Sequence, residues 1–168
     1  MTDEPQAETS RGSAPGRGLR HPEPPKEVVT GFLKALEDLD VDRALTFAAS
    51  DIVYQNVPLP SARGVAAVEK QLRFMAKYGS GFEARTHHIA ADGNVVLTER
   101  TDVLRRGAWE AEFWVCGTFE VEAGRIVLWR DYFDWTTFLA ASAKGAGRVA
   151  LAGARTLFGR YKAKQSVR

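Results

Sequence analysis

The sequence contains a single cysteine, Cys116, among its 168 residues. One cysteine cannot form an internal disulfide or the paired-cysteine part of a zinc site, so we expect a protein of the reducing cytoplasm. Long apolar runs are also missing, since the longest run of small apolar residues covers only 149–154, too few to span a bilayer. The first residues include Asp3, Glu4 and Pro5 and lack the pattern of a secretory signal. Export and membrane insertion are therefore not expected.

Charge is nearly balanced overall but unevenly placed. The chain has 23 Lys and Arg against 21 Asp and Glu, a net charge of +2, which is too small to predict a nucleic-acid partner. No acidic residue follows Asp134, whereas seven basic residues do. Such a basic tail is typical either of a weak contact with an anionic membrane or another polyanion, or of a solvated helix that keeps a protein soluble.

Proline is concentrated at the start of the chain and is rare beyond it. Residues 1–25 hold five of the seven prolines, and this composition buries too little apolar surface to offset the loss of chain entropy. We therefore predict a disordered leader over 1–25, one folded domain over 26–142 and a basic helical tail over 143–168.

Apolar spacing predicts three helices before any long strand. From Lys26, the residues Val28, Phe32, Leu36 and Leu39 recur at the spacing of one helix face. A second short helix is expected from Val41, capped by Asp40 and ending near Ser50, and a third over Val65–Lys77 after Gly64. A last helix from Trp135 is expected to cover one mouth of the fold, with Phe138 and Leu139 facing inward.

Alternating side chains and turn dipeptides predict five strands. A first strand of mixed polarity, Ile52–Val57, ends at Pro58. Four long strands then follow as an antiparallel meander, because Asp92-Gly93, Arg106-Gly107 and Ala123-Gly124 are typical turn sequences. Helices grouped before such a meander indicate an α+β fold, in which a curved, mainly antiparallel sheet wraps around the N-terminal helices and forms a cone with a deep apolar pocket. The four strands are Phe82–Ala91, Val95–Leu104, Ala108–Val121 and Arg125–Asp134.

Polar residues occur on strand faces that are otherwise apolar. Asp131 shares a face with Val127, Trp129 and Phe133, and a lone buried carboxylate there would be costly. Arg100 and Asp102 lie between apolar ends of another strand face, while Tyr54 and Asn56 share a face of the first strand. One interpretation is a surface Arg-Asp pair with Asp131 in water. The other is a buried cluster in which one guanidinium bridges two carboxylates.

A buried Arg with two carboxylates is a device for sharing a proton. With both carboxyls ionised the group carries a net −1 in a dry pocket, so one of them is expected to take up a proton. Such a site holds an acid and a base at neutral pH.

The motifs Tyr54-x-Asn56, Arg100-x-Asp102 and Trp129-Arg130-Asp131-Tyr132-Phe133-Asp134 resemble the active-site set of the limonene-1,2-epoxide hydrolases, in the same order and at similar spacing over roughly 27–139. The resemblance implies the cone-shaped fold of the nuclear-transport-factor-2-like superfamily, a homodimer, and hydrolysis of an epoxide to a diol without cofactor or covalent intermediate. In the roles it implies, Asp131 is the general base, Tyr54 and Asn56 hold the attacking water, Asp102 is the general acid and Arg100 spans both carboxyls.

The pocket around these groups is expected to be apolar, so the substrate would be a hydrophobic epoxide of terpene, fatty-acid or sterol type. The candidates for its wall, any of which is also a typical core residue, are Leu36, Met75, Leu104, Phe113, Val115, Phe133 and Phe138.

Two other functions fit the same fold. One is an isomerase or cyclase in which an Asp moves a proton on carbon, although Arg100 would depress the pKa of that base. The other is a lipid- or steroid-binding module without turnover. A metal centre is not expected, because His87 and His88 are adjacent on a strand and should point to opposite faces.

Overall fold

The computed structural model describes residues 23–165, with side chains to residue 151. This part of the chain forms four helices and a six-stranded sheet, so the predicted α+β class is confirmed. The helices are α1 (Pro25–Glu37), α2 (Val41–Thr46), α3 (Val65–Tyr78) and α4 (Trp135–Gln165), and the strands are β1 (Ala48–Val57), β2 (Ala62–Arg63), β3 (Gly81–Asp92), β4 (Val95–Arg106), β5 (Trp109–Glu122) and β6 (Arg125–Tyr132).

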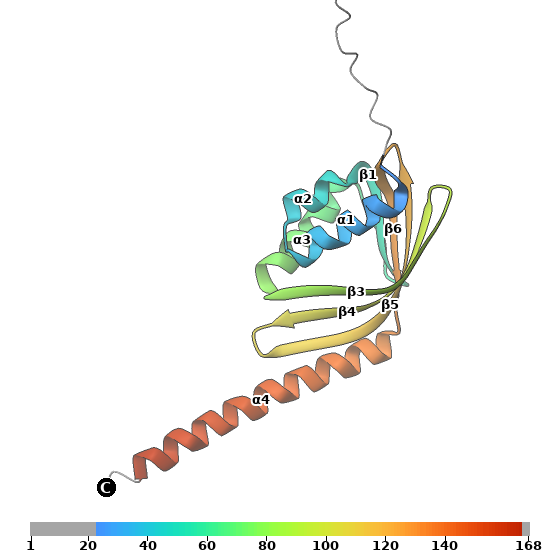
Figure 1. Cartoon of the computed structure of the whole chain (residues 1–168). Coiled ribbons are helices and arrows are strands. Elements are labelled where there is room, and N and C mark those ends of the chain that lie inside the picture. The colour runs from blue at the N-terminus through green and yellow to red at the C-terminus, as the bar shows by residue number, and fades with distance from the viewer. Residues whose placement is uncertain (1–22, 166–168) are drawn as a thin grey trace, which may run out of the picture.

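The sheet is mixed and mostly antiparallel. Its strand order is β2-β1-β6-β5-β4-β3, and only β1 and β6 run parallel. The meander turns use Gly93, Gly107 and Gly124, all with positive φ, as the turn dipeptides predict. The long strands bend around α1, α2 and α3, whereas α4 runs along β5 and away from the body (Figure 1).

The core lies between the three N-terminal helices and the inner face of the sheet. Phe32 of α1 is fully buried and meets Trp129 of β6 edge to face, with ring centroids 5.0 Å apart. Phe119 of β5 packs on the same group. Burial of an apolar side chain of this size contributes about 2–3 kcal/mol, so this aromatic cluster fixes α1 against the strands that carry the polar site.

The first two helices end earlier than their apolar spacing predicts. Leu39 has φ of 53° and lies outside α1, which ends at Glu37. The second helix ends at Thr46, not near Ser50, because Ala48 pairs with Ile126 and the backbone of Phe47 accepts from the amide of Ile126. Pairing with β6 thus recruits the end of the expected helix into β1. The two-residue strand β2 was not predicted.

Two β-bulges, one in β6 and one in β3, change which face of the sheet the nearby residues lie on. In β6 the register shifts opposite Glu120 and Val121, so Ile126 joins Trp129 in the core in place of the predicted Val127. In β3 the register shifts between Thr86 and His88. The expectation that His87 and His88 point to opposite faces is therefore wrong.

Both histidines contact the outer face of β4. His87 Nε2 lies 2.9 Å from Thr101 Oγ1 and His88 Nδ1 lies 2.8 Å from Glu99 Oε2. The two β4 residues are two positions apart and share one side of the strand. Within residues 23–151, no group of three or more His, Cys, Asp or Glu side chains is arranged to hold a metal ion.

The predicted leader and the predicted tail are described only in part. The predicted leader, apart from its last three residues, lies outside the described part, and α4 continues as one helix across the predicted boundary at 142 and 143. In the described part, no helix is both long enough and apolar enough to cross a bilayer.

Candidate active site

The inner faces of β4 and β6 bring one arginine and two carboxylates into direct contact. Arg100 Nε donates to Asp102 Oδ1 at 2.8 Å and its Nη2 donates to Asp102 Oδ2 at 3.3 Å. The same Nη2 lies 2.7 Å from Asp131 Oδ1. The side chains of Arg100, Asp102 and Asp131 are 1%, 8% and 6% exposed. The interpretation of these residues as a solvent-exposed pair is therefore wrong, and the buried cluster is present.

Strand geometry explains why these three groups meet. Arg100 and Asp102 are two residues apart on β4, so both face inward. Gly117 of β5 lies between them and β6, since it pairs with Thr98 on one side and with Asp131 on the other. A strand without a side chain at this point lets the guanidinium reach across to β6.

Burial and charge act in opposite directions on the titration of the two carboxyls. Burial raises the pKa of Asp102 to about 6, although the Arg100 charge and its hydrogen bonds pull it down. Burial likewise raises the pKa of Asp131 against the lowering effect of Arg100. For Arg100, burial alone would lower the pKa, but the two carboxylates outweigh it and raise the pKa above its usual range. The cluster can therefore hold one proton on a carboxyl near neutral pH.

Tyr54 and Asn56 extend the polar group from β1. Asn56 pairs with Asp131 in the parallel register, and its Nδ2 donates to the Tyr54 hydroxyl at 2.7 Å. The Tyr54 ring stacks on Trp129 with centroids 3.8 Å apart. Burial, with the nearby Asp131 charge, raises the pKa of Tyr54, so the phenol stays protonated and can donate a hydrogen bond.

A cavity of about 280 Å³ opens in front of these groups. The polar side chains in its wall are Tyr54, Asn56, Asp102 and Asp131, while Arg100 lies behind them. All seven apolar residues predicted for the wall also line it. The phenyl rings of Phe113, Phe133 and Phe138 close one side, with centroids 4.9–5.8 Å apart.

Several residues of the site were not predicted as such. Thr98 accepts from Arg100 Nη1 at 3.0 Å, so it shares the support of the guanidinium. Phe82, Trp129 and Trp135 line the cavity, and Trp135 is held by a 2.8 Å hydrogen bond from its Nε1 to the carbonyl of Val57. Thr98 and Trp129 lie on the inner faces already singled out by residue parity. That pattern could have identified both.

Gly117 is the least visible of these residues in the sequence. A Cβ at this position would overlap Arg100 Nη1 and lie 2.6 Å from Thr98 Oγ1. Only glycine leaves room for the guanidinium between β4 and β6. No local pattern marks it, because the requirement comes from a neighbouring strand.

Chemically, the arrangement offers two buried carboxyls with raised pKa values on one wall of an apolar cavity. Asp131 Oδ1 and Trp129 Nε1 are buried and make no aligned hydrogen bond within the described structure. Asp131 Oδ1 faces Arg100 Nη2 at 2.7 Å, and the Asp131 side chain also lines the cavity with Asn56 and Tyr54, where a small polar group could meet it. The site can accept a proton from one group and give one to another on a bound molecule.

Comparisons with known proteins agree with this geometry. Residues 23–144 match the limonene-1,2-epoxide hydrolase catalytic domain. The curated epoxide hydrolase EphG of Mycobacterium tuberculosis is 49% identical over 106 residues, which are 63% of this chain and 70% of that protein.

Solved structures show the same fold. A limonene-epoxide-hydrolase-like epoxide hydrolase of M. tuberculosis superposes with a TM-score of 0.71 at 41% identity, covering 76% of this chain and 96% of the other. An NTF2-like protein of unknown function from Burkholderia pseudomallei, at 15% identity, gives a TM-score of 0.63 over 70% of this chain and 96% of its own, and supports the fold alone. With the family match spanning most of the chain, the protein is an epoxide hydrolase of the limonene-1,2-epoxide hydrolase family.

Proposed function

We propose that this enzyme opens a hydrophobic epoxide in one step, with water as the nucleophile and two carboxyls as base and acid. The observation that carries the proposal is the contact of one buried guanidinium with both carboxyls at the wall of an apolar cavity. The oxygen of water forms a bond to one oxirane carbon while the carbon–oxygen bond of the ring breaks. Relief of ring strain supplies much of the driving force.

Asp131 is proposed as the general base. It is the carboxyl next to Asn56 in the sheet register, so a water held by Asn56 and Tyr54 would lie against it. Its raised pKa makes it a stronger proton acceptor than an exposed aspartate. When water attacks, its proton passes to Asp131.

Asp102 is proposed as the general acid. Its pKa of about 6 places its titration close to neutral pH, so it can carry a proton at rest and release it to the oxirane oxygen. A bare alkoxide is a poor leaving group, and an acid at this point is expected to contribute about 10²- to 10⁴-fold in rate. After turnover the proton lies on Asp131, and Arg100, in contact with both carboxyls, stabilises either distribution of the charge.

The cavity supports a substrate of terpene, fatty-acid or sterol type. Its wall is mostly aromatic and aliphatic, and about 280 Å³ is at the small end of ligand pockets. We expect a ring or chain to pack against Phe113, Phe133 and Phe138 with its epoxide toward the carboxyls. No cofactor is needed for this reaction.

The test is single-turnover hydrolysis of a panel of hydrophobic epoxides in ¹⁸O-labelled water. Direct attack by water puts the label into the diol in the first turnover. A diol that first carries unlabelled oxygen would indicate an ester formed on an enzyme carboxylate and contradict the one-step route. Conversion without any diol would favour an isomerase or cyclase, and binding without conversion would favour a lipid-binding module.

We also propose that the enzyme is a homodimer. Leu97, Trp114 and Tyr132 lie on the outer face of three adjacent strands and are 48%, 50% and 40% exposed. The family resemblance implies a second copy as partner, and we propose that it packs on this face. Light scattering of wild type and Trp114→Glu would test it, since loss of the dimer is expected in the variant only.

We also propose a cellular compartment for the enzyme and an end point for its catalytic domain. A cytoplasmic enzyme is supported by the single unpaired Cys116. The catalytic domain is proposed to end near residue 142, with the basic remainder of the chain serving outside the reaction. Its contact with an anionic membrane is developed below.

A further inference from the structure

The outer face of α3 carries two large aromatic side chains that the cavity does not use. Phe74 is 65% exposed and Tyr78 is 43% exposed, and their rings lie 4.6 Å apart. Lys70, Lys77 and both aromatic residues border one shallow hollow on this helix. Met75, on the same turn, faces the other way and lines the catalytic cavity.

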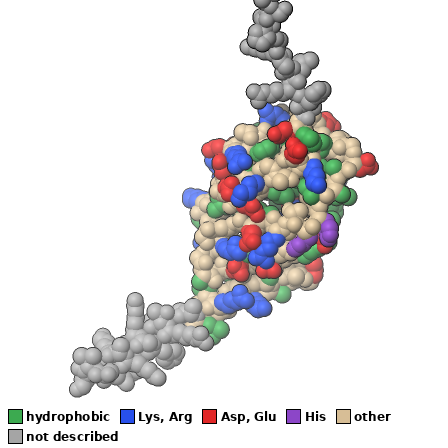
Figure 2. Space-filling model, viewed as in Figure 1, with side chains coloured by type: hydrophobic (Ala, Val, Ile, Leu, Met, Phe, Trp, Pro, Cys, Tyr) green, Lys and Arg blue, Asp and Glu red, His purple; other side chains and the backbone are tan. Residues whose placement is uncertain are grey.

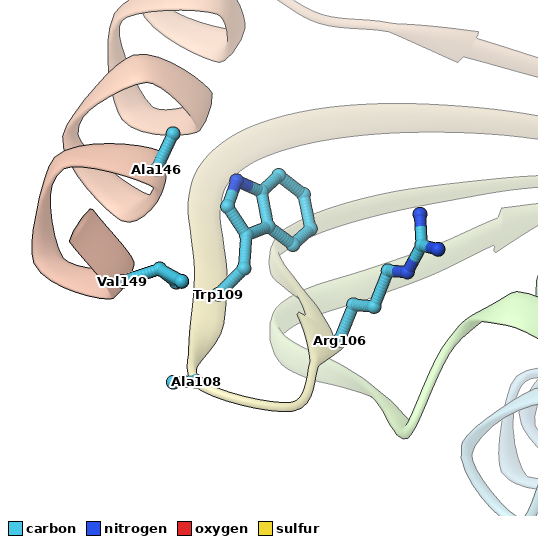
Figure 3. A pocket seen from close by; sticks show the side chains of 5 residues that line it. All are labelled: Arg106, Ala108, Trp109, Ala146 and Val149. Atoms are coloured by element: carbon cyan, nitrogen blue, oxygen red, sulfur yellow. The ribbon is translucent and has the colours of Figure 1, made fainter. Parts of the chain in front are cut away.

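This aromatic face is continuous with α4. Arg106, at the end of β4, places its guanidinium 5.9 Å from the centre of the Tyr78 ring, and Lys77 Nζ lies 5.3 Å from the same ring. Arg106 also borders a second hollow of about 500 Å³ with Trp109 of β5 and Val149 of α4 (Figure 3). Trp109 Nε1 donates to the carbonyl of Ser142 at 3.0 Å and ties α4 to this hollow.

We call this region the α3–α4 surface. It is formed by Lys70, Phe74, Lys77, Tyr78, Arg106, Trp109, Lys144, Arg148, Val149 and Leu151.

The α3–α4 surface combines positive charge with exposed apolar side chains. Val149 and Leu151 of α4 are 40% and 64% exposed. Arg73, which borders the same α3 hollow, pairs with Glu69 and Asp42. Within residues 23–151, the five lysines and arginines named for this surface make no ion pair. The acidic neighbours Glu110 and Glu112 are engaged by Arg105 and Arg85. Basic side chains gather on α4 just before the grey segment in Figure 2, and no acidic residue follows in the sequence.

We propose that the α3–α4 surface docks onto an anionic lipid bilayer. Unpaired cations bind anionic headgroups, while exposed aromatic and aliphatic side chains enter the boundary between headgroups and acyl chains. Lysine and arginine stems with nearby aromatic rings suit this boundary, since both have an apolar body and a polar end. A second protein would need a shaped, satisfied interface, whereas a bilayer requires only these two chemistries on one face.

Docking at this face would hold the enzyme at the bilayer. Met75, Phe82 and Leu104 in the cavity wall lie within four residues of Tyr78 or Arg106 in the sequence. A lipophilic epoxide dissolved in the bilayer would then be concentrated near the enzyme. This advantage rests on the proposed substrate class, but the docking itself does not.

The test is flotation of the full-length protein with vesicles, without any epoxide present. One set contains phosphatidylcholine mixed with phosphatidylserine and the other phosphatidylcholine alone. Binding to the mixed vesicles only, and its loss at high salt, are expected. Each cation near the surface contributes about fivefold to binding, so Lys77→Glu is expected to weaken binding at least about fivefold and Phe74→Ser about as much. The matched charge control is Lys26→Glu, an exposed position of α1 outside this surface, which should bind like wild type.

Several results would overturn the proposal. One is no binding to the mixed vesicles, and another is binding that persists unchanged in both Lys77→Glu and Phe74→Ser, which would assign it to the rest of the tail. Displacement by a DNA fragment with no effect of Phe74→Ser would indicate a general polyanion site. Hydrolysis of a small water-soluble epoxide is expected to be unchanged in these variants, so failure to dock is distinguishable from failure of the catalytic assignment.

Discussion

Two arginine–carboxylate pairs on neighbouring strands have nearly the same local geometry and opposite electrostatic behaviour. Glu83 and Arg85 of β3 are two residues apart with Nε and Oε1 at 2.7 Å, and Arg100 and Asp102 of β4 are two residues apart with Nε and Oδ1 at 2.8 Å. The first pair is 36–43% exposed, whereas the second is 1–8% exposed. Hydrogen bonds from Arg85 and Arg105 lower the pKa of Glu83 to about 2, whereas burial raises the pKa of Asp102 to about 6.

The difference shows that burial, and not distance to the arginine, turns such a pair into a site for proton transfer. A solvated carboxylate beside arginine stays ionised at every physiological pH. A buried carboxyl that shares its arginine with a second carboxyl can hold a proton. The outer pair can therefore serve as an internal control for the inner one.

The largest effect is expected from removing either of the two titrating carboxyls that contact Arg100, Asp102 of the inner pair and Asp131 beside it. We expect Asp131→Asn and Asp102→Asn each to lower kcat by at least about 10²-fold, because each keeps the shape of the side chain and removes a proton transfer. Glu83→Gln, the matched change in the outer pair, should leave kcat within about twofold of wild type. Steady-state diol formation measures all three. Wild-type turnover in either Asn variant, with the fold checked by circular dichroism, would refute the assignment.

The next effect comes from the space that the inner arginine requires. Gly117→Ala should displace the Arg100 guanidinium, since a Cβ there overlaps Nη1. Misplacement of a catalytic group by about 1 Å can cost about 10²-fold, so a fall in kcat/KM of about 10- to 100-fold is expected. Gly81→Ala is the control, because its Cβ would lie at an ordinary 3.6 Å from the Arg105 side chain.

Stability and activity must be separated in the Gly117 variant. The melting temperature and the fraction of active sites are measured alongside kcat/KM, so that a loss of folded protein is not counted as a loss of rate. A folded Gly117→Ala enzyme with wild-type kcat/KM would show that Arg100 tolerates displacement.

A change of one pH unit is expected to have a smaller effect than removal of a titrating carboxyl. The acid role of Asp102 requires its protonated form, so kcat/KM should fall by about tenfold per pH unit well above the pKa of about 6. Glu83→Gln should show the same profile, because Glu83 is ionised throughout this range. A profile that stays flat from pH 6 to 9 would contradict the assignment of Asp102 as the acid, and stopped assays across this range would reveal it.

Residue parity along the strands predicted most of the site, and the packing between strands accounts for what it missed. Arg100 and Asp102 share a face because β4 is regular, and that follows from the sequence alone. The bulge in β3 places His87 and His88 on one face, and the bulge in β6 exchanges Val127 for Ile126 in the core. A bulge depends on the partner strand, so local alternation cannot reveal it.

Long-range pairing also explains the errors in the helices and the unnoticed glycine. The segment after Thr46 has helical spacing, but the sheet hydrogen bonds of Ala48 and Phe47 with β6 override it. Glycine is needed at position 117 because the side chains of Arg100 and Thr98 on β4 occupy the space that a Cβ would take. Both features depend on a residue far away in the sequence.

The smallest effect is expected on the free energy of unfolding. Its sign follows from the raised pKa of Asp102 and the lowered pKa of Glu83. The pKa of Asp102 is raised from 3.8 to about 6 in the folded state, so the fold binds this proton more tightly than the unfolded chain, and its stabilisation is lost as pH rises through about 6. Glu83 has the opposite sign, but its stabilisation is lost only as pH falls from 4.5 toward about 2, which is outside the range from pH 5 to 7. We expect the free energy of unfolding in urea to drop from pH 5 to pH 7 by about 1 kcal/mol more in wild type than in Asp102→Asn. Equal changes in the two proteins would mean that the pKa of Asp102 is not raised by burial.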